Sequence, residues 1–194
     1  MPHQVHSAEV WELTADNLHG FVPDADAVIT RLPNQWIGVR TADCVPVLLV
    51  DTTQRLVAAV HAGWRGTVAH IVSRTVQQMK QMGCHPADLY AMIGPSIGPE
   101  VFEVGEEVAE AFGAAGRADC IVREAWGPLG RQRMVKPHVD LWQSNVMDLM
   151  DEGLSIDHID CSPWCSFTNH DRLFSARREG IGTGRIVSAV RIVC

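Results

Sequence analysis

Two apolar segments are the most informative for the fold: Val45-Pro46-Val47-Leu48-Leu49-Val50 and Leu56-Val57-Ala58-Ala59-Val60. An unbroken apolar run of this length is typical of a strand that is buried on both faces. Pro46 must lie near the start of that strand because proline cannot donate to a sheet ladder. The turn at 51–54 links the two strands, and an antiparallel pairing would place the start of the first strand beside the end of the second.

The segments around this hairpin alternate between strand-like and helix-like patterns. Apolar runs at 25–30, 36–40, 89–93, 156–161, 172–176 and 186–193 predict strands, and helical spacing at 68–82, 106–112 and 141–150 predicts helices. These elements follow one another without a regular strand–helix–strand rhythm. We therefore expect an α+β fold with mixed sheets rather than a doubly wound one.

Length and composition narrow the classes of function. The 194 residues suit a single domain that spans 1–194. The net charge of −7 argues against nonspecific binding of nucleic acid, and no apolar stretch predicts a membrane span or a secretion signal. The 6 scattered cysteines are typical of free thiols, so we expect a cytoplasmic protein with no membrane or nucleic-acid partner.

Two potential metal ligands flank the predicted hairpin. Cys44 comes directly before its first strand and His61 directly after its second, so antiparallel pairing would place them about 5 Å apart at the backbone. His6 is a candidate third ligand. Two histidines and one cysteine form a plausible catalytic zinc site with an open fourth position, although the same donors also suit copper. Asp43 is a candidate for orienting one of the ligands.

The same residues also fit interpretations other than this zinc site. A cysteine beside a buried strand is usually a small core residue, and a histidine at a strand end is often only a hydrogen-bonded polar group. Cys44 and His61 also suit a cysteine hydrolase, as nucleophile and base. A second candidate metal site combines four further residues, namely His158, Cys161, Cys165 and His170.

Two glycine-rich stretches contain arginines that are candidates for holding an anion. In the segment 61–67, two glycines bracket Trp64-Arg65 between a strand and a helix start, where exposed N–H groups favour an anion and Arg65 can clamp a phosphate. The segment 174–185 contains Arg177, Arg178 and Arg185. At least one of these is expected to face a substrate; the alternative is that all three form surface ion pairs.

Five segments occur in an order that resembles the YfiH/laccase-domain family, which is also labelled polyphenol oxidase or multicopper-oxidase-like. The segments are Gln4-Val5-His6, Thr41-Ala42-Asp43-Cys44, His61-Ala62-Gly63-Trp64-Arg65-Gly66-Thr67, Ile93-Gly94-Pro95-Ser96-Ile97-Gly98 and Phe174-Ser175-Ala176-Arg177-Arg178. The similarity runs from residue 1 to the C-terminus. The second and third segments together make the resemblance specific.

The resemblance implies two mixed sheets that form a sandwich flanked by helices, with His6, Cys44 and His61 as metal ligands and catalytic residues. It also implies phosphorolysis of adenosine, inosine, guanosine and methylthioadenosine, together with adenosine deamination. The expected partners are a nucleoside and inorganic phosphate, which Arg65, Arg177 and Arg178 would bind. The expected cofactor is zinc, and the expected oligomeric state is a monomer or a homodimer.

The chain also departs from the family pattern. Members usually have some tens of residues before the Gln-Val-His segment, so the family's N-terminal segment is expected to be missing here. Ser7 and Ala176 stand where the family usually has a glycine and an aromatic residue or histidine. A copper-dependent polyphenol oxidase is the main alternative function, but none of the 9 histidines forms a His-x-His pair, which disfavours four-copper chemistry.

Overall fold

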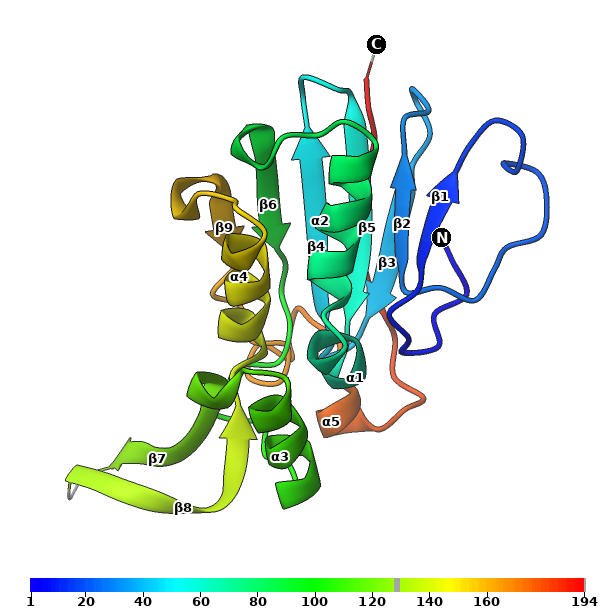
Figure 1. Cartoon of the computed structure of the whole chain (residues 1–194). Helices are drawn as coiled ribbons and strands as arrows, with labels where there is room; N and C mark the ends of the chain where they lie inside the picture. The colour runs from blue at the N-terminus through cyan, green and yellow to red at the C-terminus, as the bar shows by residue number, and fades with distance from the viewer. Residues whose placement is uncertain (128–129, 194) are drawn as a thin grey trace.

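The computed structural model describes residues 1–127 and 130–193, and its centre is a six-stranded mixed sheet in the order β1-β2-β5-β4-β6-β9 (Figure 1). The predicted hairpin is confirmed: β4 and β5 pair antiparallel, with Pro46 opposite His61. The outer pairs β1–β2 and β6–β9 are parallel. The strands are β1 (Val10–Leu13), β2 (Ala27–Thr30), β4 (Val45–Asp51), β5 (Leu56–Ala62), β6 (Leu89–Ile93) and β9 (Ile159–Cys161).

A second, smaller sheet packs on one face of this sheet. It consists of β3 (Ile37–Thr41) and β10 (Ile186–Val190), which pair antiparallel. Its core contacts come from alternate residues of the large sheet, since the two faces of a strand differ with a period of two; these are Leu13, Val28, Val57 and Ala59 against Ile37 and Val39. The α+β sandwich is therefore confirmed, with one correction: only the large sheet is mixed, because β3 and β10 pair solely with each other among the described strands.

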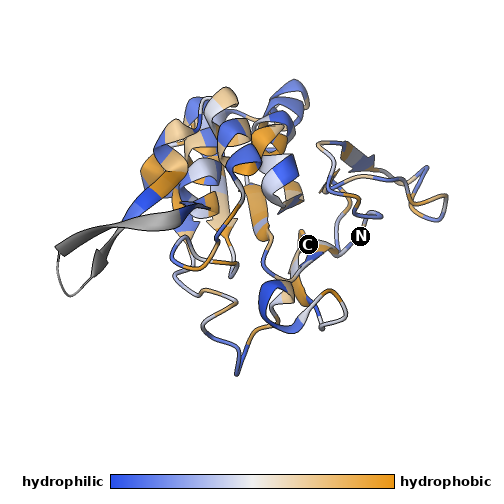
Figure 2. Cartoon of the chain, turned by 90° about the horizontal axis from the view of Figure 1, so that it is seen from below, coloured by the Kyte–Doolittle hydropathy of each residue, from blue (hydrophilic) through white to orange (hydrophobic). Residues whose placement is uncertain are grey.

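Helices cover the opposite face of the large sheet. The helices α2 (Ile71–Gln81) and α4 (Leu141–Asp151) lie over it in Figure 1, and Figure 2 shows apolar strands beneath helices of mixed hydropathy. Buried side chains of both helices join the main core, which contains Ile71, Val76 and Leu149. This packing explains the apolar run in β4, which is covered on both faces.

The remaining elements lie around the ends of the strands. They are α1 (Trp64–Val68), α3 (Glu106–Ala114), α5 (Ala176–Glu179), the ribbon of β7 (Ile121–Gly127) and β8 (Gly130–Val139), and 3-10 turns at Pro86–Asp88, Ala118–Cys120 and Ile156–His158. The strand predicted at 172–176 is wrong. Ser175 instead caps the short helix α5, since its hydroxyl accepts a hydrogen bond from the Arg178 amide at 3.3 Å.

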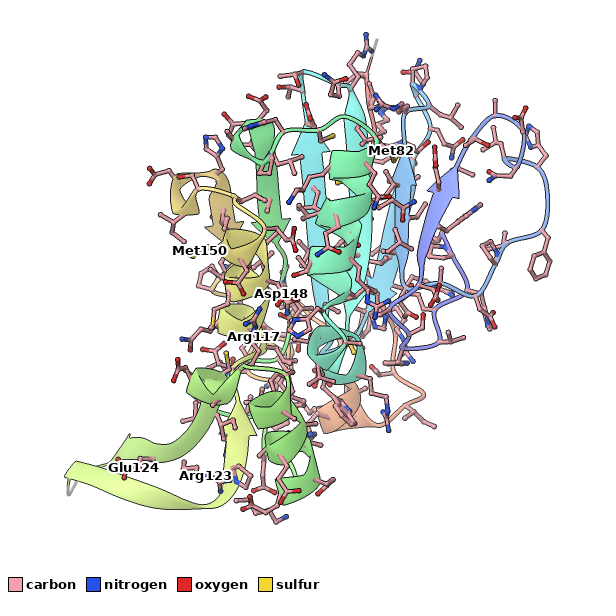
Figure 3. All side chains as sticks on the ribbon, viewed as in Figure 1. Met82, Arg117, Arg123, Glu124, Asp148 and Met150 are labelled. Carbon is pink, nitrogen blue, oxygen red and sulfur yellow. The ribbon has the colours of Figure 1, made fainter. Side chains whose placement is uncertain are left out.

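A buried polar cluster fastens α4 to its neighbours. Arg117 donates from one guanidinium nitrogen to Asp148 and to Asp151, and Figure 3 labels Arg117 and Asp148. The ring of His70 bonds to Asp148 at 2.9 Å. Asp148 is fully buried, so removing Arg117 would leave its carboxylate in the interior with the His70 ring as its remaining hydrogen-bond partner among the described residues. None of the helices in the described part of the chain combines the length and apolar character that crossing a bilayer requires.

Candidate metal centre

His6, Cys44 and His61 converge on one point, and their donor atoms all lie within 4.8 Å of one another. Cys44 directly precedes β4 and His61 lies near the end of β5, so the hairpin register brings them together. His6 comes from the N-terminal segment, and its Nε2 atom lies 3.9 Å from the Cys44 sulfur. The two imidazole rings meet edge to face, with centroids 4.9 Å apart. The structure thus brings together the three residues predicted as ligands.

A buried carboxylate, Asp26, holds two of these ligands in place. It lies directly before β2 and is 0 % exposed. Its oxygens accept hydrogen bonds from Nδ1 of His61 at 2.7 Å and from the backbone N–H of His6 at 3.0 Å. They also accept bonds from the backbone of Val5 and from both the backbone and the hydroxyl of Ser7. Because Nδ1 of His61 donates to Asp26, its Nε2 is left as the metal-binding nitrogen.

Asp26 was not singled out from the sequence; the one signal was an acidic residue at the start of an otherwise apolar strand. Asp43, which was expected to orient a ligand, serves another purpose. Its carboxylate accepts hydrogen bonds from the Ser166 hydroxyl at 2.7 Å and from the Arg177 backbone N–H at 2.6 Å. Asp43 therefore anchors the start of α5 and the loop before it near the site.

The backbone around the ligands is unusually constrained. His6 and Asp43 adopt positive φ angles of 60° and 88°, a region that side chains other than glycine occupy at a cost. Gly63 leaves room for the ligands: a Cβ there would lie 2.9 Å from the His6 ring and 3.0 Å from the Cys44 sulfur. Strained ligand segments packed against an obligatory glycine are typical of a site whose geometry serves function.

The electrostatics of the group favour a metal-binding thiolate. Burial raises the pKa of the Cys44 thiol, but its contacts with the His6 and His61 imidazoles outweigh burial and lower the pKa to about 7. Burial lowers the pKa of His61, yet the hydrogen bond to Asp26 and the nearby Cys44 raise it to about 9. For Asp26, burial is opposed by hydrogen bonds from His61 and Ser7, which lower its pKa to about 2. Cys44 is thus poised to deprotonate near neutral pH.

The Cys44 and His6 donors are spaced close to what a tetrahedral ion requires, and the whole set, within 4.8 Å, would draw in by up to about an ångström on binding. With zinc–sulfur and zinc–nitrogen bonds of about 2.3 and 2.0 Å, tetrahedral ligands lie about 3.6 Å apart. The 3.9 Å between the Cys44 sulfur and His6 Nε2 needs a shift of only a few tenths of an ångström. Three protein ligands leave the fourth position open to the adjoining cavity. The donor set therefore can hold a metal ion, and its chemistry accepts zinc or copper.

A cavity of about 570 Å³ opens beside the three ligands. Its lining comes from the N-terminal segment, β3, the hairpin, α5 and the loop after α5, namely Gln4, His6, Arg40, Ala42, Cys44, His61, Ala176, Ile181 and Arg185. This volume lies within the usual range for a small-molecule site. Ala176, one of the two residues that depart from the family pattern, faces this cavity, and the other, Ser7, donates its hydroxyl to Asp26.

The three arginines predicted to bind phosphate do not line this cavity. Arg65 stacks over the ring of Trp64, with its guanidinium carbon 4.4 Å from the ring centroid. Arg177 donates to the Glu103 carbonyl at 2.9 Å and faces a neighbouring hollow of about 350 Å³. Arg178 donates to the Phe167 carbonyl at 3.2 Å. The cavity instead contains Arg40 and Arg185, of which the first was not considered from the sequence.

The second candidate metal site, at 158–170, is not formed. In the part of the chain that the structure describes, only His6, Cys44 and His61 gather as a potential metal group. The ring of His158 stacks on Tyr90 with centroids 4.2 Å apart, and the Cys165 sulfur accepts a hydrogen bond from the Gly98 N–H at 3.2 Å. These partners hold the two residues in separate packing environments.

Comparison with known proteins places this geometry in a family. The family model described as multi-copper polyphenol oxidoreductase laccase matches residues 1–193. The chain belongs to this family. In the laccase-domain family, a purine nucleoside phosphorylase of Bacteroides thetaiotaomicron is 43 % identical over 176 residues, which cover 90 % of this chain and 62 % of that protein. The adenosine deaminase RL5 of an unknown prokaryotic organism is 40 % identical over 200 residues, covering 98 % and 73 %.

Solved structures of laccase-domain proteins have the same fold. The YfiH protein of Bacillus licheniformis superposes with a TM-score of 0.87 at 26 % identity, over 99 % of this chain and 73 % of that one. The chain spans only about 62 % of the Bacteroides phosphorylase. The activity of that longer protein is therefore a hypothesis for this chain, which its own site must support.

Proposed function

We propose that this chain is a zinc-dependent purine nucleoside enzyme that cleaves adenosine, inosine, guanosine and methylthioadenosine with phosphate and also deaminates adenosine. The observation that supports this best is the His6–Cys44–His61 group at the wall of the cavity. The relatives that are named purine nucleoside phosphorylase and adenosine deaminase support both reactions. Zinc bound at these residues would supply Lewis-acid charge beside the substrate.

The residues of the chain provide positioning and charge. Asp26 holds the His61 imidazole through Nδ1 and fixes the backbone of His6, so both rings present one nitrogen to the same point. In phosphorolysis, a phosphate oxygen bonds to the anomeric carbon of the ribose as the bond to the purine nitrogen breaks. The purine leaves with that electron pair and takes up a proton, giving ribose 1-phosphate. In deamination, water replaces the amino group at C6 and ammonia leaves.

The direct test is incubation of the purified protein with inosine and phosphate. We expect stoichiometric hypoxanthine and ribose 1-phosphate, and their loss in the variant Cys44→Ala. Undiminished hypoxanthine release by that variant would contradict the proposed role of the thiolate.

Two alternatives have separate readouts. Bound copper with dioxygen uptake on a phenol would support a polyphenol oxidase. Inactivation of an active, metal-free protein by one equivalent of alkylating agent at Cys44 would support a cysteine hydrolase.

A further inference from the structure

The charge of the cavity beside the metal centre is opposite to that of the whole chain. The chain has a net charge of −7. Among the nine described residues that line the cavity, two are arginines, two are histidines and none is acidic. A cleft of one sign focuses the field and concentrates ligands of the opposite sign. The lining therefore favours an anion at a position next to the metal ligands.

The two arginines converge because of the register between β3 and β10. Arg40 pairs with Val187, and Arg185 precedes Val187 by two residues. Arg185 directly precedes β10, whose first residue, Ile186, pairs with Thr41. Continuing this register by one residue sets Arg185 opposite Ala42 and diagonally across from Arg40. Diagonal partners are about 7–8 Å apart, a gap that long side chains span. Both arginines line the cavity beside the metal ligands.

The backbone of Arg40 is held by hydrogen bonds, whereas its guanidinium is available to a ligand. The side-chain amide of Gln4 donates to the Arg40 carbonyl at 2.8 Å and accepts from its N–H at 2.9 Å, which clamps the segment that contains His6 onto β3. The Arg40 guanidinium makes no hydrogen bond or ion pair with the residues that the structure describes. The position of the Arg40 backbone is thus fixed, and its planar guanidinium fork is available for bidentate contact with phosphate.

Arg185 lines the cavity and also orders the loop after α5. It donates to the carbonyls of Ile181 and Gly184, each at 2.9 Å, and so holds the loop from which Ile181 faces the cavity. It also donates to the Thr183 carbonyl, so the hydrogen bonds that the structure describes for its guanidinium all go to this loop, while its charge lies beside the cavity. Arg40 and Arg185 therefore have different tasks: the first is available to a ligand, and the second fixes the loop and adds positive potential.

We propose that Arg40, supported by Arg185, forms the binding subsite for inorganic phosphate as co-substrate of the metal centre. This assignment rests on the proposed function. It replaces the expected contacts with Arg65, Arg177 and Arg178, which lie outside the cavity lining. It also separates the two reactions, because phosphorolysis needs phosphate whereas deamination needs only water.

The test compares both reactions in the zinc-loaded full chain. In Arg40→Gln we expect the KM for phosphate in inosine cleavage to rise about tenfold or more, as for loss of a charged contact, while adenosine deamination stays within about twofold. Arg40→Lys keeps the charge without the fork and should give an intermediate KM. Arg74→Gln, which removes an arginine on α2, is the matched control and should leave the KM for phosphate unchanged.

Several results would overturn the subsite. An unchanged KM for phosphate in Arg40→Gln would do so, as would an equal loss of phosphorolysis and deamination. Faster deamination of adenosine monophosphate than of adenosine in the wild type, lost in Arg40→Gln, would assign the guanidinium to a nucleotide's own phosphate instead.

If the wild type shows neither reaction, the proposed function fails and the subsite is tested by binding. Inorganic phosphate should then raise the Tm of the wild type and not that of Arg40→Gln, and an equal rise in both would refute the subsite.

Discussion

Replacing Asp26 by asparagine should dismantle the metal centre without altering any of its ligands. The carboxylate is fully buried and accepts five hydrogen bonds, from the backbone of Val5, His6 and Ser7, the Ser7 hydroxyl and the His61 ring. An amide of the same shape has one acceptor oxygen where the carboxylate has two. Its NH₂ group must face donors, so at least two hydrogen bonds are lost.

The size of the effect follows from those bonds. Hydrogen bonds to a charged group contribute about 1.5–3 kcal/mol each, so the loss of two destabilises the chain by about 3 kcal/mol or more. The His61 ring also loses the partner that fixes its tautomer. Loss of such a partner typically weakens metal binding about 10–100-fold. We therefore expect a lower free energy of unfolding together with weaker zinc affinity.

The assay is urea unfolding of the metal-free protein and zinc titration against a competing chelator. Asp24→Asn is the matched control, because Asp24 also contacts a histidine, His3, at 2.7 Å, but both side chains are 69 % exposed. An exposed pair contributes little, so this control should stay within about 0.5 kcal/mol of the wild type. Zinc affinity of Asp26→Asn within twofold of the wild type would show that the Asp26 carboxylate does not hold the metal ligands in place.

Three further predictions follow from the same geometry. Gly63→Ala should lose bound zinc, because its Cβ would lie 2.9 Å from the His6 ring and 3.0 Å from the Cys44 sulfur. Gly113→Ala is the control and should keep zinc, because no atom lies within 4 Å of the new Cβ. Equal zinc content of the two variants by elemental analysis would contradict this prediction. In the metal-free protein, alkylation of Cys44 should be half-maximal near pH 7, since its pKa is lowered to about 7; a midpoint near 9 would be contrary evidence. The pKa of Asp26 falls from 3.8 to about 2 on folding. Its protonation should therefore lower the free energy of unfolding by about 2 kcal/mol as the pH drops from about 4 to about 2. Acid titration should show this loss in the wild type and not in Asp26→Asn.

The hairpin and two of the ligands were predictable because their signals are local. The apolar run of β4 and the following strand indicate an antiparallel pair, and the pairing alone places Cys44 beside His61. The role of Asp26 was not predictable in the same way. It depends on the pairing of β2 with β5, which sets Ala27 against Val60 and so brings Asp26 next to His61. No spacing rule within one segment reveals that contact.

The arginines of the cavity show the same limit. Arg40 lies in an ordinary strand pattern, and only the long-range pairing of β3 with β10 places it near Arg185. The segment around Ser175 was wrongly predicted as a strand because its short apolar run outweighed the capping signal of the serine. Local sequence patterns thus identify helices and strands, whereas the residues that surround the metal ligands are brought there by contacts between distant segments.

X-ray absorption spectroscopy of the zinc-loaded protein tests the proposed metal centre most directly. We expect one sulfur at about 2.3 Å and two imidazole nitrogens at about 2.0 Å around a single ion, with the sulfur shell missing in Cys44→Ala. A zinc shell of nitrogen and oxygen only, unchanged by that substitution, would contradict the claim that His6, Cys44 and His61 form the metal centre.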